Sequence, residues 1–196
     1  MTRTDILNAI AKTIGARRYV EIGVRNPADN FDLIQVTDKV GVDPRPARGD
    51  ILAMTSDAYF AARPEPADLY FIDGLHDELQ AYADFVHAGV SLWPRGVIVM
   101  HDCLPRSLAA MAPEKPAGGG AWNGTVWRAW QSAAHCPGWD SMLVADDHGC
   151  GVIWRGVRQR GAPFRAVSEQ DFLAMGDHLK DVNPLAAVLA ALEARQ

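Results

Sequence analysis

The sequence lacks the features that mark several classes of protein. It has no excess of basic residues, because the formal net charge is −5 and Lys and Arg are spread singly, so a nucleic-acid partner is not expected. It has no run of the roughly 20 apolar residues that a membrane span needs. The three cysteines, Cys103, Cys136 and Cys150, form no CxxC pair, which favours a reducing compartment over a disulfide framework or a structural zinc site. We therefore expect a cytoplasmic protein without membrane partners.

A fingerprint of nicotinamide dinucleotide binding is missing as well. The GxGxxG pattern does not follow the first predicted strand, and the segment Arg25–Pro27 gives a pyrophosphate no close backbone approach. A dehydrogenase is thus disfavoured. The chain does have 196 residues with 48% hydrophobic and 22% charged side chains, which is the composition of one globular domain. We expect a single domain over residues 1–196.

Short apolar segments alternate with helical patterns along the first half of the chain. The segment from Asp77 to Leu92 carries Leu79, Val86 and Val90 on one face, together with Tyr82 and Ala83, and this face is predicted to be buried. Apolar strands separated by helices predict a mostly parallel sheet covered on both faces, which is a doubly wound α/β fold. Strands are expected at 18–23, 39–43, 51–54, 68–73 and 97–100, a turn at 93–96, and helices at 4–14, 28–36, from 56, and at 77–92.

The pattern changes after residue 103. Three prolines and the run Gly118–Gly120 predict a long, lid-like loop at about 104–121. A helix is expected at 122–134, with Trp122, Trp127 and Trp130 as core anchors. Residues 141–145 and 152–154 are expected to form a β-hairpin, and the tail at about 168–196 is helical in pattern.

Polar and acidic residues gather where the predicted strands end. Ligands of doubly wound sheets bind outside the carboxyl ends of the strands, and acids there can accept hydrogen bonds from ribose hydroxyls, an adenine amino group or an ammonium group. A pyrophosphate would be repelled. The residues at these ends are Glu21, Gly23, Asp43, Ser56, Asp57, Asp73, His101 and Asp102.

Each of these acids also has a purely structural interpretation. Asp43 precedes Pro44 and could begin a turn, and Glu21 could be a buried acid paired with an arginine. Asp57 could stabilise a helix N-terminus through the helix dipole, while Asp73 lies before Gly74 in a natural strand-ending turn.

The motifs resemble those of class I S-adenosylmethionine-dependent methyltransferases over roughly residues 19–151. Tyr19–Gly23 is similar to their first motif, which implies that Glu21 and Gly23 face the methionine half of the cofactor. The resemblance implies a ribose role for Asp43 and an adenine contact near Asp57. It also implies a Rossmann-like seven-stranded sheet with a C-terminal hairpin. The segments Phe71–His76 and Val97–Asp102 are similar to a bacterial subgroup that includes sugar and natural-product O-methyltransferases.

One segment departs from the family pattern. The glycine-rich loop is replaced by residues 23–30, which contain only one glycine. Arg25 and Asn26 could bind a carboxylate there, or the loop has lost its grip on the cofactor.

The resemblance to metal-dependent O-methyltransferases implies a divalent metal held by Asp73, His101 and Asp102. Because Mg²⁺ prefers oxygen ligands only, a histidine ligand suits Mn, Fe or Zn better. Alternatively, His101 is the general base for a substrate hydroxyl, with His76 as the second candidate.

We therefore expect methyl transfer to a hydroxyl of a small or sugar-like substrate, by a chain that could form a homo-oligomer. Two alternatives stay open, a non-catalytic cofactor-binding or scaffold module and a metal-dependent hydrolase or hydroxylase on the same fold.

Overall fold

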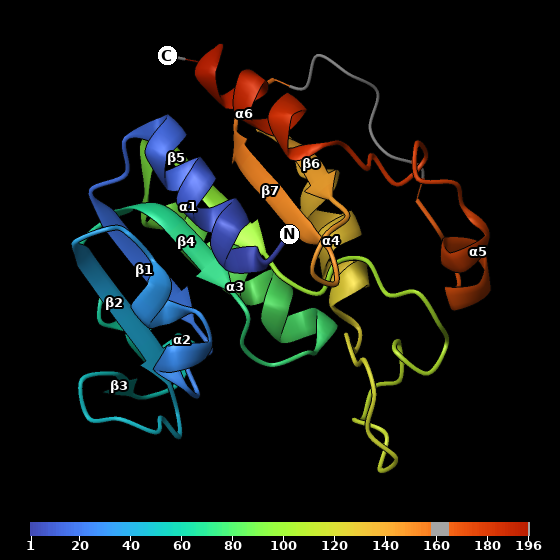
Figure 1. Cartoon of the computed structure of the whole chain (residues 1–196), viewed down its shortest axis with the longest axis horizontal. Coiled ribbons are helices and arrows are strands. Elements are labelled where there is room, and N and C mark those ends of the chain that lie inside the picture. The colour runs from blue at the N-terminus through green and yellow to red at the C-terminus, as the bar shows by residue number, and fades with distance from the viewer. Residues whose placement is uncertain (158–164, 196) are drawn as a thin grey trace.

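A seven-stranded sheet forms the centre of the computed structural model, which describes residues 1–157 and 165–195 (Figure 1). The strand order is β3-β2-β1-β4-β5-β7-β6. Strands β1 to β5 run parallel, and β7 pairs antiparallel with β5 and β6. The predicted doubly wound sheet with a C-terminal hairpin is confirmed. The strands are β1 (Arg18–Ile22), β2 (Asp38–Asp43), β3 (Leu52–Ala53), β4 (Ala67–Ile72), β5 (Leu92–Met100), β6 (Trp139–Val144) and β7 (Cys150–Arg155).

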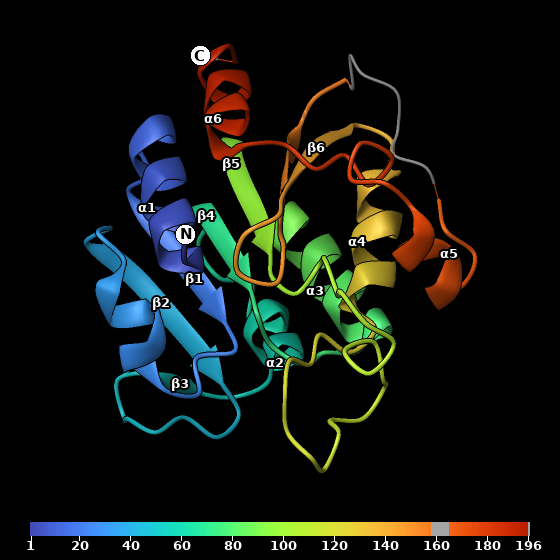
Figure 2. The same ribbon diagram turned by 45° about the vertical axis from the view of Figure 1, so that its right-hand side comes forward.

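Helices cover both faces of the sheet (Figures 1 and 2). One face packs against α1 (Arg3–Ile14) and α6 (Leu185–Glu193), and the other against α2 (Ser56–Ala61), α3 (Glu78–Val90) and α4 (Val126–Ala134). Helix α5 (Glu169–Ala174) reaches α4 through the Phe172 and Trp127 rings, whose centroids lie 4.8 Å apart. The sheet therefore buries apolar side chains on both sides, as its continuous hydrophobic strands require.

The first helix begins earlier than the sequence pattern indicates. Thr2, not Thr4, is the N-cap, and it forms a capping box in which its side chain accepts from the Asp5 amide and Asp5 accepts from the Thr2 amide. The helix ends at Gly15, whose φ of 62° gives the left-handed conformation expected of a glycine cap. Thr4 instead donates a hydrogen bond to Asn30.

The predicted helix at 28–36 is wrong. Two short 3₁₀ turns occupy this region, η1 (Pro27–Asp29) and η2 (Phe31–Leu33). Asn30 separates them with φ −154° and ψ −55°, outside the helical region, because its side chain is drawn into hydrogen bonds with Thr4 and Glu21. A local apolar pattern cannot reveal such long-range bonds.

Smaller corrections concern three boundaries. The predicted turn at 93–96 belongs to β5, and a register shift between Ala67 and Leu69 accommodates the longer strand. Helix α4 begins at Val126 rather than at 122. The predicted helical tail is divided into α5 and α6, with Gln196 outside the described residues.

Helix α3 is apolar on the face opposite to the one that packs on the sheet. Its buried side chains are Ala81, Asp84, Phe85, Ala88 and Gly89. The predicted buried face instead points outward, with Leu79 78% and Val90 80% exposed. The small residues of the inner face let α3 approach its neighbours closely, and the C-terminal part lies against the Trp139 ring. The spacing of the apolar residues predicted the helix correctly, but the face that it predicted to be buried is the exposed one.

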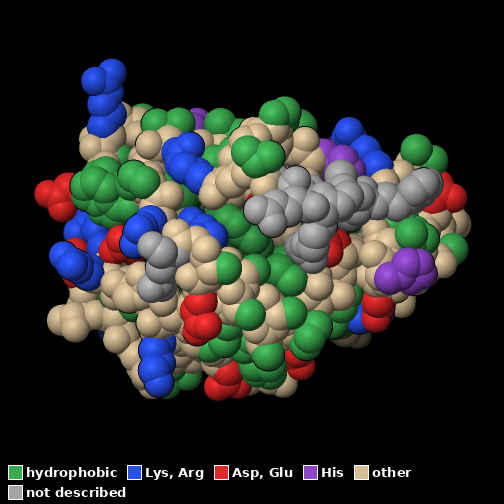
Figure 3. Space-filling view, turned by 90° about the horizontal axis from the view of Figure 1, so that it is seen from above, with side chains coloured by type: hydrophobic (Ala, Val, Ile, Leu, Met, Phe, Trp, Pro, Cys, Tyr) green, Lys and Arg blue, Asp and Glu red, His purple; other side chains and the backbone are tan. Residues whose placement is uncertain are grey.

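The end of the molecule seen in Figure 3 carries basic, acidic and hydrophobic side chains side by side. This mixed character differs from the single-sign face that binds a polyanion. None of the helices in the described part of the chain is long and apolar enough to cross a membrane.

A substitution at Phe85 tests the orientation of α3. Phe85 is 1% exposed, so Phe85→Ala should lower the free energy of unfolding by about 3–5 kcal/mol. Leu33→Ala is the control, because Leu33 is 56% exposed and its truncation should change stability by less than about 0.5 kcal/mol. Urea unfolding followed by tryptophan fluorescence measures both. Equal effects of the two substitutions would contradict this orientation.

Candidate active site

A cleft of about 960 Å³ opens at the carboxyl ends of β1, β2, β4 and β5. The loop between β5 and α4, yellow-green to yellow in Figure 2, extends beyond these strand ends, and Trp122 lines the cleft from it. Every site residue predicted from the sequence lines this one cleft. These residues are Glu21, Gly23, Arg25, Asn26, Asp43, Ser56, Asp57, Asp73, His76, His101 and Asp102.

Gly23 lets two strand ends approach each other. Its φ is 101°, and a Cβ atom at this position would lie 2.0 Å from the carbonyl oxygen of Asp73. Its amide donates to the Val42 carbonyl at 2.8 Å. Only glycine fits here. Because Gly23 has no side chain, the backbone of Asp73 can lie beside the end of β1.

Glu21 is buried at the end of β1 and held by neutral side chains. Its Oε2 accepts hydrogen bonds from the Tyr19 hydroxyl at 2.5 Å and from Asn30 Nδ2 at 2.9 Å. Burial raises the pKa of Glu21 to about 7, although these two hydrogen bonds and the charge of Arg3 act in the opposite direction. Among the described residues, no arginine forms an ion pair with Glu21.

Asp43 and Asp57 have the structural roles that the sequence left open, and both line the cleft as well. Asp43 Oδ1 accepts from the Arg45 amide at 2.7 Å, which closes the turn after β2. Asp57 lies in the first turn of α2, where an acid is favoured by the helix dipole. Its Oδ1 accepts from Gln80 Nε2, which also donates to the Ser56 hydroxyl, at 3.2 Å in each case.

His101 lies among three carboxylates. Its Nδ1 is 3.2 Å from an oxygen of Asp73 and 3.2 Å from an oxygen of Asp102, and its Nε2 is 3.6 Å from Asp147. Burial lowers the pKa of His101, but the three acids outweigh it and hold the pKa well above the usual value. The imidazole is therefore protonated at neutral pH and has no lone pair to accept a proton. In this charge state both ring nitrogens donate toward the surrounding carboxylates. The general-base and metal-ligand roles of His101 stay predictions.

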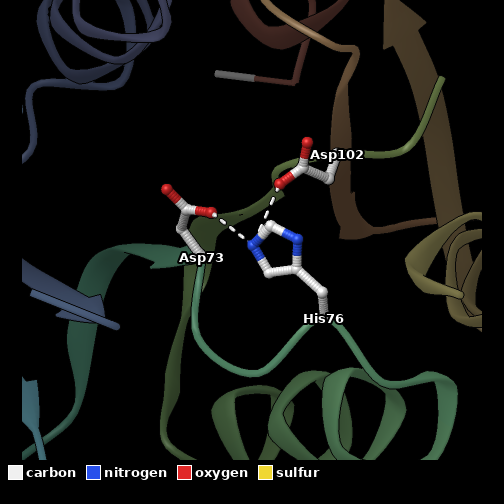
Figure 4. Close-up of side chains that lie close together, drawn as sticks. All are labelled: Asp73, His76 and Asp102. Atoms are coloured by element: carbon white, nitrogen blue, oxygen red, sulfur yellow. Dashed lines mark ion pairs between the residues drawn. The ribbon is translucent and has the colours of Figure 1, made fainter. Parts of the chain in front are cut away.

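Asp73, His76 and Asp102 form a second cluster that faces the cleft (Figure 4). His76 Nε2 lies 3.3 Å from Asp102 Oδ2 and 3.8 Å from Asp73 Oδ1. One ligand atom from each residue lies within 4.8 Å of the other two. This trio shares Asp73 and Asp102 with the predicted ligand set and has His76 where the prediction has His101. The predicted set of Asp73, His101 and Asp102 stays a prediction.

The tautomer of His76 follows from its other nitrogen. Nδ1 lies 3.1 Å from the carbonyl oxygen of Trp122, and because a carbonyl only accepts, Nδ1 carries the hydrogen. In the neutral ring the lone pair of Nε2 then points at two carboxylate oxygens. A cation bound between the three atoms would turn this repulsion into attraction.

Residues 122–125 support both His76 and Asp102. The Trp122 ring stacks on His76 at 4.6 Å between centroids, and the buried Asn123 donates to Asp102 Oδ1 at 2.9 Å. Asp102 has φ 59°, a conformation uncommon outside glycine, at the end of β5. Trp122 was predicted to be a core anchor and instead lines the cleft, whereas Trp127 and Trp130 are core residues as predicted.

Three functional positions had no signal in the sequence. Arg3 comes from the first turn of α1, and its Nε lies 3.9 Å from Asp73 Oδ2. Asp147, in the β6–β7 turn, accepts from the Arg3 amide at 2.6 Å. Asn123, which precedes α4, donates to Asp102. Their partners lie 21 to 144 residues away in the chain, so no local spacing could have indicated them.

Comparison with known proteins agrees with this architecture. Residues 15–103 match the model of a family described as a methyltransferase domain. Among curated proteins no significant sequence match is found. An O-methyltransferase from Bacillus cereus in complex with SAH has a similar structure, with 18% identity, a TM-score of 0.56 and coverage of 78% of this chain and 80% of that one.

Two further structures are similar to the same extent. The O-methyltransferase TomG from Streptomyces achromogenes, involved in tomaymycin synthesis and solved in complex with SAM, is 14% identical, with a TM-score of 0.56 over 78% of this chain and 79% of that chain. A cofactor-bound protein from MTB is 20% identical, with a TM-score of 0.56 over 79% and 78%. The chain therefore has the fold of these S-adenosylmethionine-dependent methyltransferases, and residues 15–103 match a methyltransferase domain. The resemblance seen in the sequence is confirmed.

The pKa of Glu21 predicts a pH-dependent stability. The native pKa lies above the unfolded value of 4.5, so the native state binds this proton more tightly and loses stability as pH rises from 4.5 to 7. Glu21→Gln removes the ionised form while keeping an oxygen for Tyr19 and Asn30. At pH 8 the substitution should raise the free energy of unfolding by about 3 kcal/mol relative to the unaltered chain, and at pH 4.5 by little. Urea unfolding in metal-free buffer measures this difference, and a gap that does not change with pH would contradict it.

Proposed function

We propose that this chain transfers the methyl group of S-adenosylmethionine to a hydroxyl group of a small molecule. The proposal rests on one observation, that two sets of polar residues share a single cleft. Glu21, Asp43 and Asp57 come from the ends of β1 and β2 and from α2, whereas Asp73, His76 and Asp102 come from the ends of β4 and β5 and the loop after β4. The first set suits a cationic nucleoside, and the second suits a reacting hydroxyl.

The cofactor would be held by acids that accept hydrogen bonds. Asp43 follows β2 and can accept from the two ribose hydroxyls, while Asp57 and Ser56 lie where they can contact the adenine. Glu21 and Gly23 would meet the methionine half, and Arg25, which is exposed on the rim of the same cleft, suits its carboxylate. SAM or SAH is bound in the Streptomyces and Bacillus structures of this fold.

The acceptor side would hold a divalent cation. Two carboxylates and an imidazole converge there, with His76 fixed in the tautomer that exposes Nε2. Although burial acts to raise the pKa of Asp73, the charge and hydrogen bond of His101 and the charge of Arg3 lower it, so this carboxylate is ionised. Mixed oxygen and nitrogen donors favour Mn, Fe or Zn over Mg. A cation bound there would lower the pKa of a hydroxyl beside it.

The protein's own residues supply the remaining requirements of the reaction. The O–CH₃ bond forms as the C–S bond of the sulfonium breaks, which needs the oxygen, the carbon and the sulfur in line. Both proposed binding sets line the same cleft. His101 carries the positive charge that keeps Asp73 and Asp102 together, and the predicted lid at about 104–121 brings Trp122 over the acceptor side.

The proposal also includes a cytoplasmic location and a small-molecule partner. The three cysteines are free thiols in the structure, which fits a reducing, cytoplasmic environment. The proposed partner of the cleft is a small molecule.

Cofactor binding is tested by calorimetry with SAH. We expect micromolar affinity, and Asp43→Ala should weaken binding at least tenfold, because a hydrogen bond to a charged group contributes about 1.5–3 kcal/mol. Asp38→Ala is the matched control, since Asp38 lies at the other end of β2 and pairs with Arg18 outside the cleft.

Three results would each have a distinct meaning. No binding of SAH at millimolar concentration would refute the proposed enzyme. Equal losses for Asp43→Ala and Asp38→Ala would refute the ribose role of Asp43. Binding of S-adenosylmethionine without methyl transfer to any catechol, sugar or phenol acceptor would support a cofactor-binding module instead.

Metal binding is tested with Mn²⁺ and chelator-treated protein. Electron paramagnetic resonance should show one bound ion per chain, and His76→Ala and Asp102→Ala should each weaken binding at least tenfold. His178→Ala is the control, because His178 is exposed and does not line the cleft. If His76→Ala abolished methyl transfer but left Mn²⁺ affinity unchanged, His76 would be a proton acceptor and the proposed ligand set would be wrong.

A further inference from the structure

The side chain of Gln80, in the first turn of α3, lies among three oxygen atoms at the cleft. Its Nε2 is 3.2 Å from the Ser56 hydroxyl, 3.2 Å from Asp57 Oδ1 and 3.0 Å from Asp84 Oδ1. All four residues line the cleft. Asp84 is only 1% exposed, and a carboxyl group is costly to bury without hydrogen-bond partners. The proposed function gives neither Gln80 nor Asp84 a role.

The orientation of the Gln80 amide follows from the chemistry of these neighbours. An ionised carboxylate such as that of Asp57 accepts hydrogen bonds and donates none. Burial raises the pKa of Asp84, whereas hydrogen bonds from Ser56 and Gln80 act in the opposite direction. Because the Ser56 hydroxyl spends its hydrogen on Asp84, its oxygen is left to accept from Gln80. All three neighbours therefore require the NH₂ group of the amide, and turning the amide over would place oxygen against oxygen.

The carbonyl oxygen of Gln80 is consequently available to a ligand. Within residues 1–157 and 165–195, no hydrogen bond is donated to Gln80 Oε1 or to Asp57 Oδ2. These two acceptors belong to side chains that are hydrogen-bonded to each other. A ligand group that fits both must donate two hydrogen atoms from one place, which is what an amino group on the edge of a ring does.

Apolar side chains in the same cleft suit the ring that would carry such an amino group. Met54 and Leu75 line the cleft, and Leu75 is 64% exposed there. A planar purine has apolar faces and a polar edge. In adenine the group at position 6 of this edge is an amino group, whereas in hypoxanthine it is a keto oxygen. A keto oxygen would meet two acceptors with no hydrogen between them, which is unfavourable.

We infer that Gln80 is the residue that selects adenine as the base of the cofactor. Its Oε1 accepts one hydrogen of the adenine amino group and Asp57 accepts the other, while Ser56, Asp57 and Asp84 hold the amide in the required orientation. The inference rests on the proposed function, and it adds the residue that distinguishes adenine from other purines.

The test compares two ligands by calorimetry on the full chain, SAH and S-inosylhomocysteine, which has the keto oxygen in place of the amino group. The unaltered chain should bind SAH at least about tenfold more tightly, because the keto analogue loses the hydrogen bonds and leaves the acceptors unpaired. Gln80→Met keeps the length of the side chain without its amide. This variant should weaken SAH binding about tenfold and leave binding of the keto analogue unchanged or tighter.

Gln35→Met is the matched control, because Gln35 is exposed and does not line the cleft. It should leave both affinities unchanged, and circular dichroism melting confirms that each variant folds. Equal binding of the two ligands by the unaltered chain overturns the inference without the use of any variant. An unchanged preference in Gln80→Met assigns the selection to Asp57 alone and overturns the role of Gln80.

Two further outcomes separate this inference from the proposed function. Equal weakening of both ligands by Gln80→Met would show that Gln80 only shapes the cleft, so the inference would fall while the proposed function stands. Absence of SAH binding by the unaltered chain at millimolar concentration would refute the proposed function, and the inference with it.

Discussion

Three carboxylates share one buried imidazole at the carboxyl ends of β4 and β5, and the geometry of the cleft depends on this arrangement. The carboxylates of Asp73, Asp102 and Asp147 would repel one another, and protonated His101 offsets that repulsion. Arg3 adds a second positive charge from the N-terminal helix. These contacts thereby hold together α1, the ends of β4 and β5, and the β6–β7 turn.

The same arrangement explains why His101 and His76 differ in chemistry although both lie near Asp73 and Asp102. His101 is buried among acids that raise its pKa. It therefore keeps its proton, and its positive charge offsets their negative charges. His76 lies at the mouth of the strands, with one nitrogen fixed by the Trp122 carbonyl and the other turned toward the cleft. Environment, and not residue type, decides which histidine is available to a ligand.

Helix α3 has one face against the sheet and one face exposed at the surface of the molecule. Its inner face carries small residues, Phe85 and the buried Asp84, and it packs on the sheet that presents Asp73 and Asp102. Its outer face carries the exposed side chains of Leu79, Val86 and Val90. Both faces are hydrophobic, and this is the reason why periodicity alone selected the wrong one, since a helix with two apolar faces has no unique core side from its sequence.

The alternation of apolar strands and helices was enough to predict the doubly wound sheet, its C-terminal hairpin and the residues at its strand ends, because strand direction places all those ends at one edge. All eleven predicted site residues do line one cleft. Their individual roles depended on contacts across the chain: Asn30 breaks a predicted helix by binding Glu21, Asn123 orients Asp102, and Arg3 reaches Asp73. Local pattern determines which residues arrive at the edge, whereas burial and long-range charge, which only the tertiary structure decides, determine their protonation and partners.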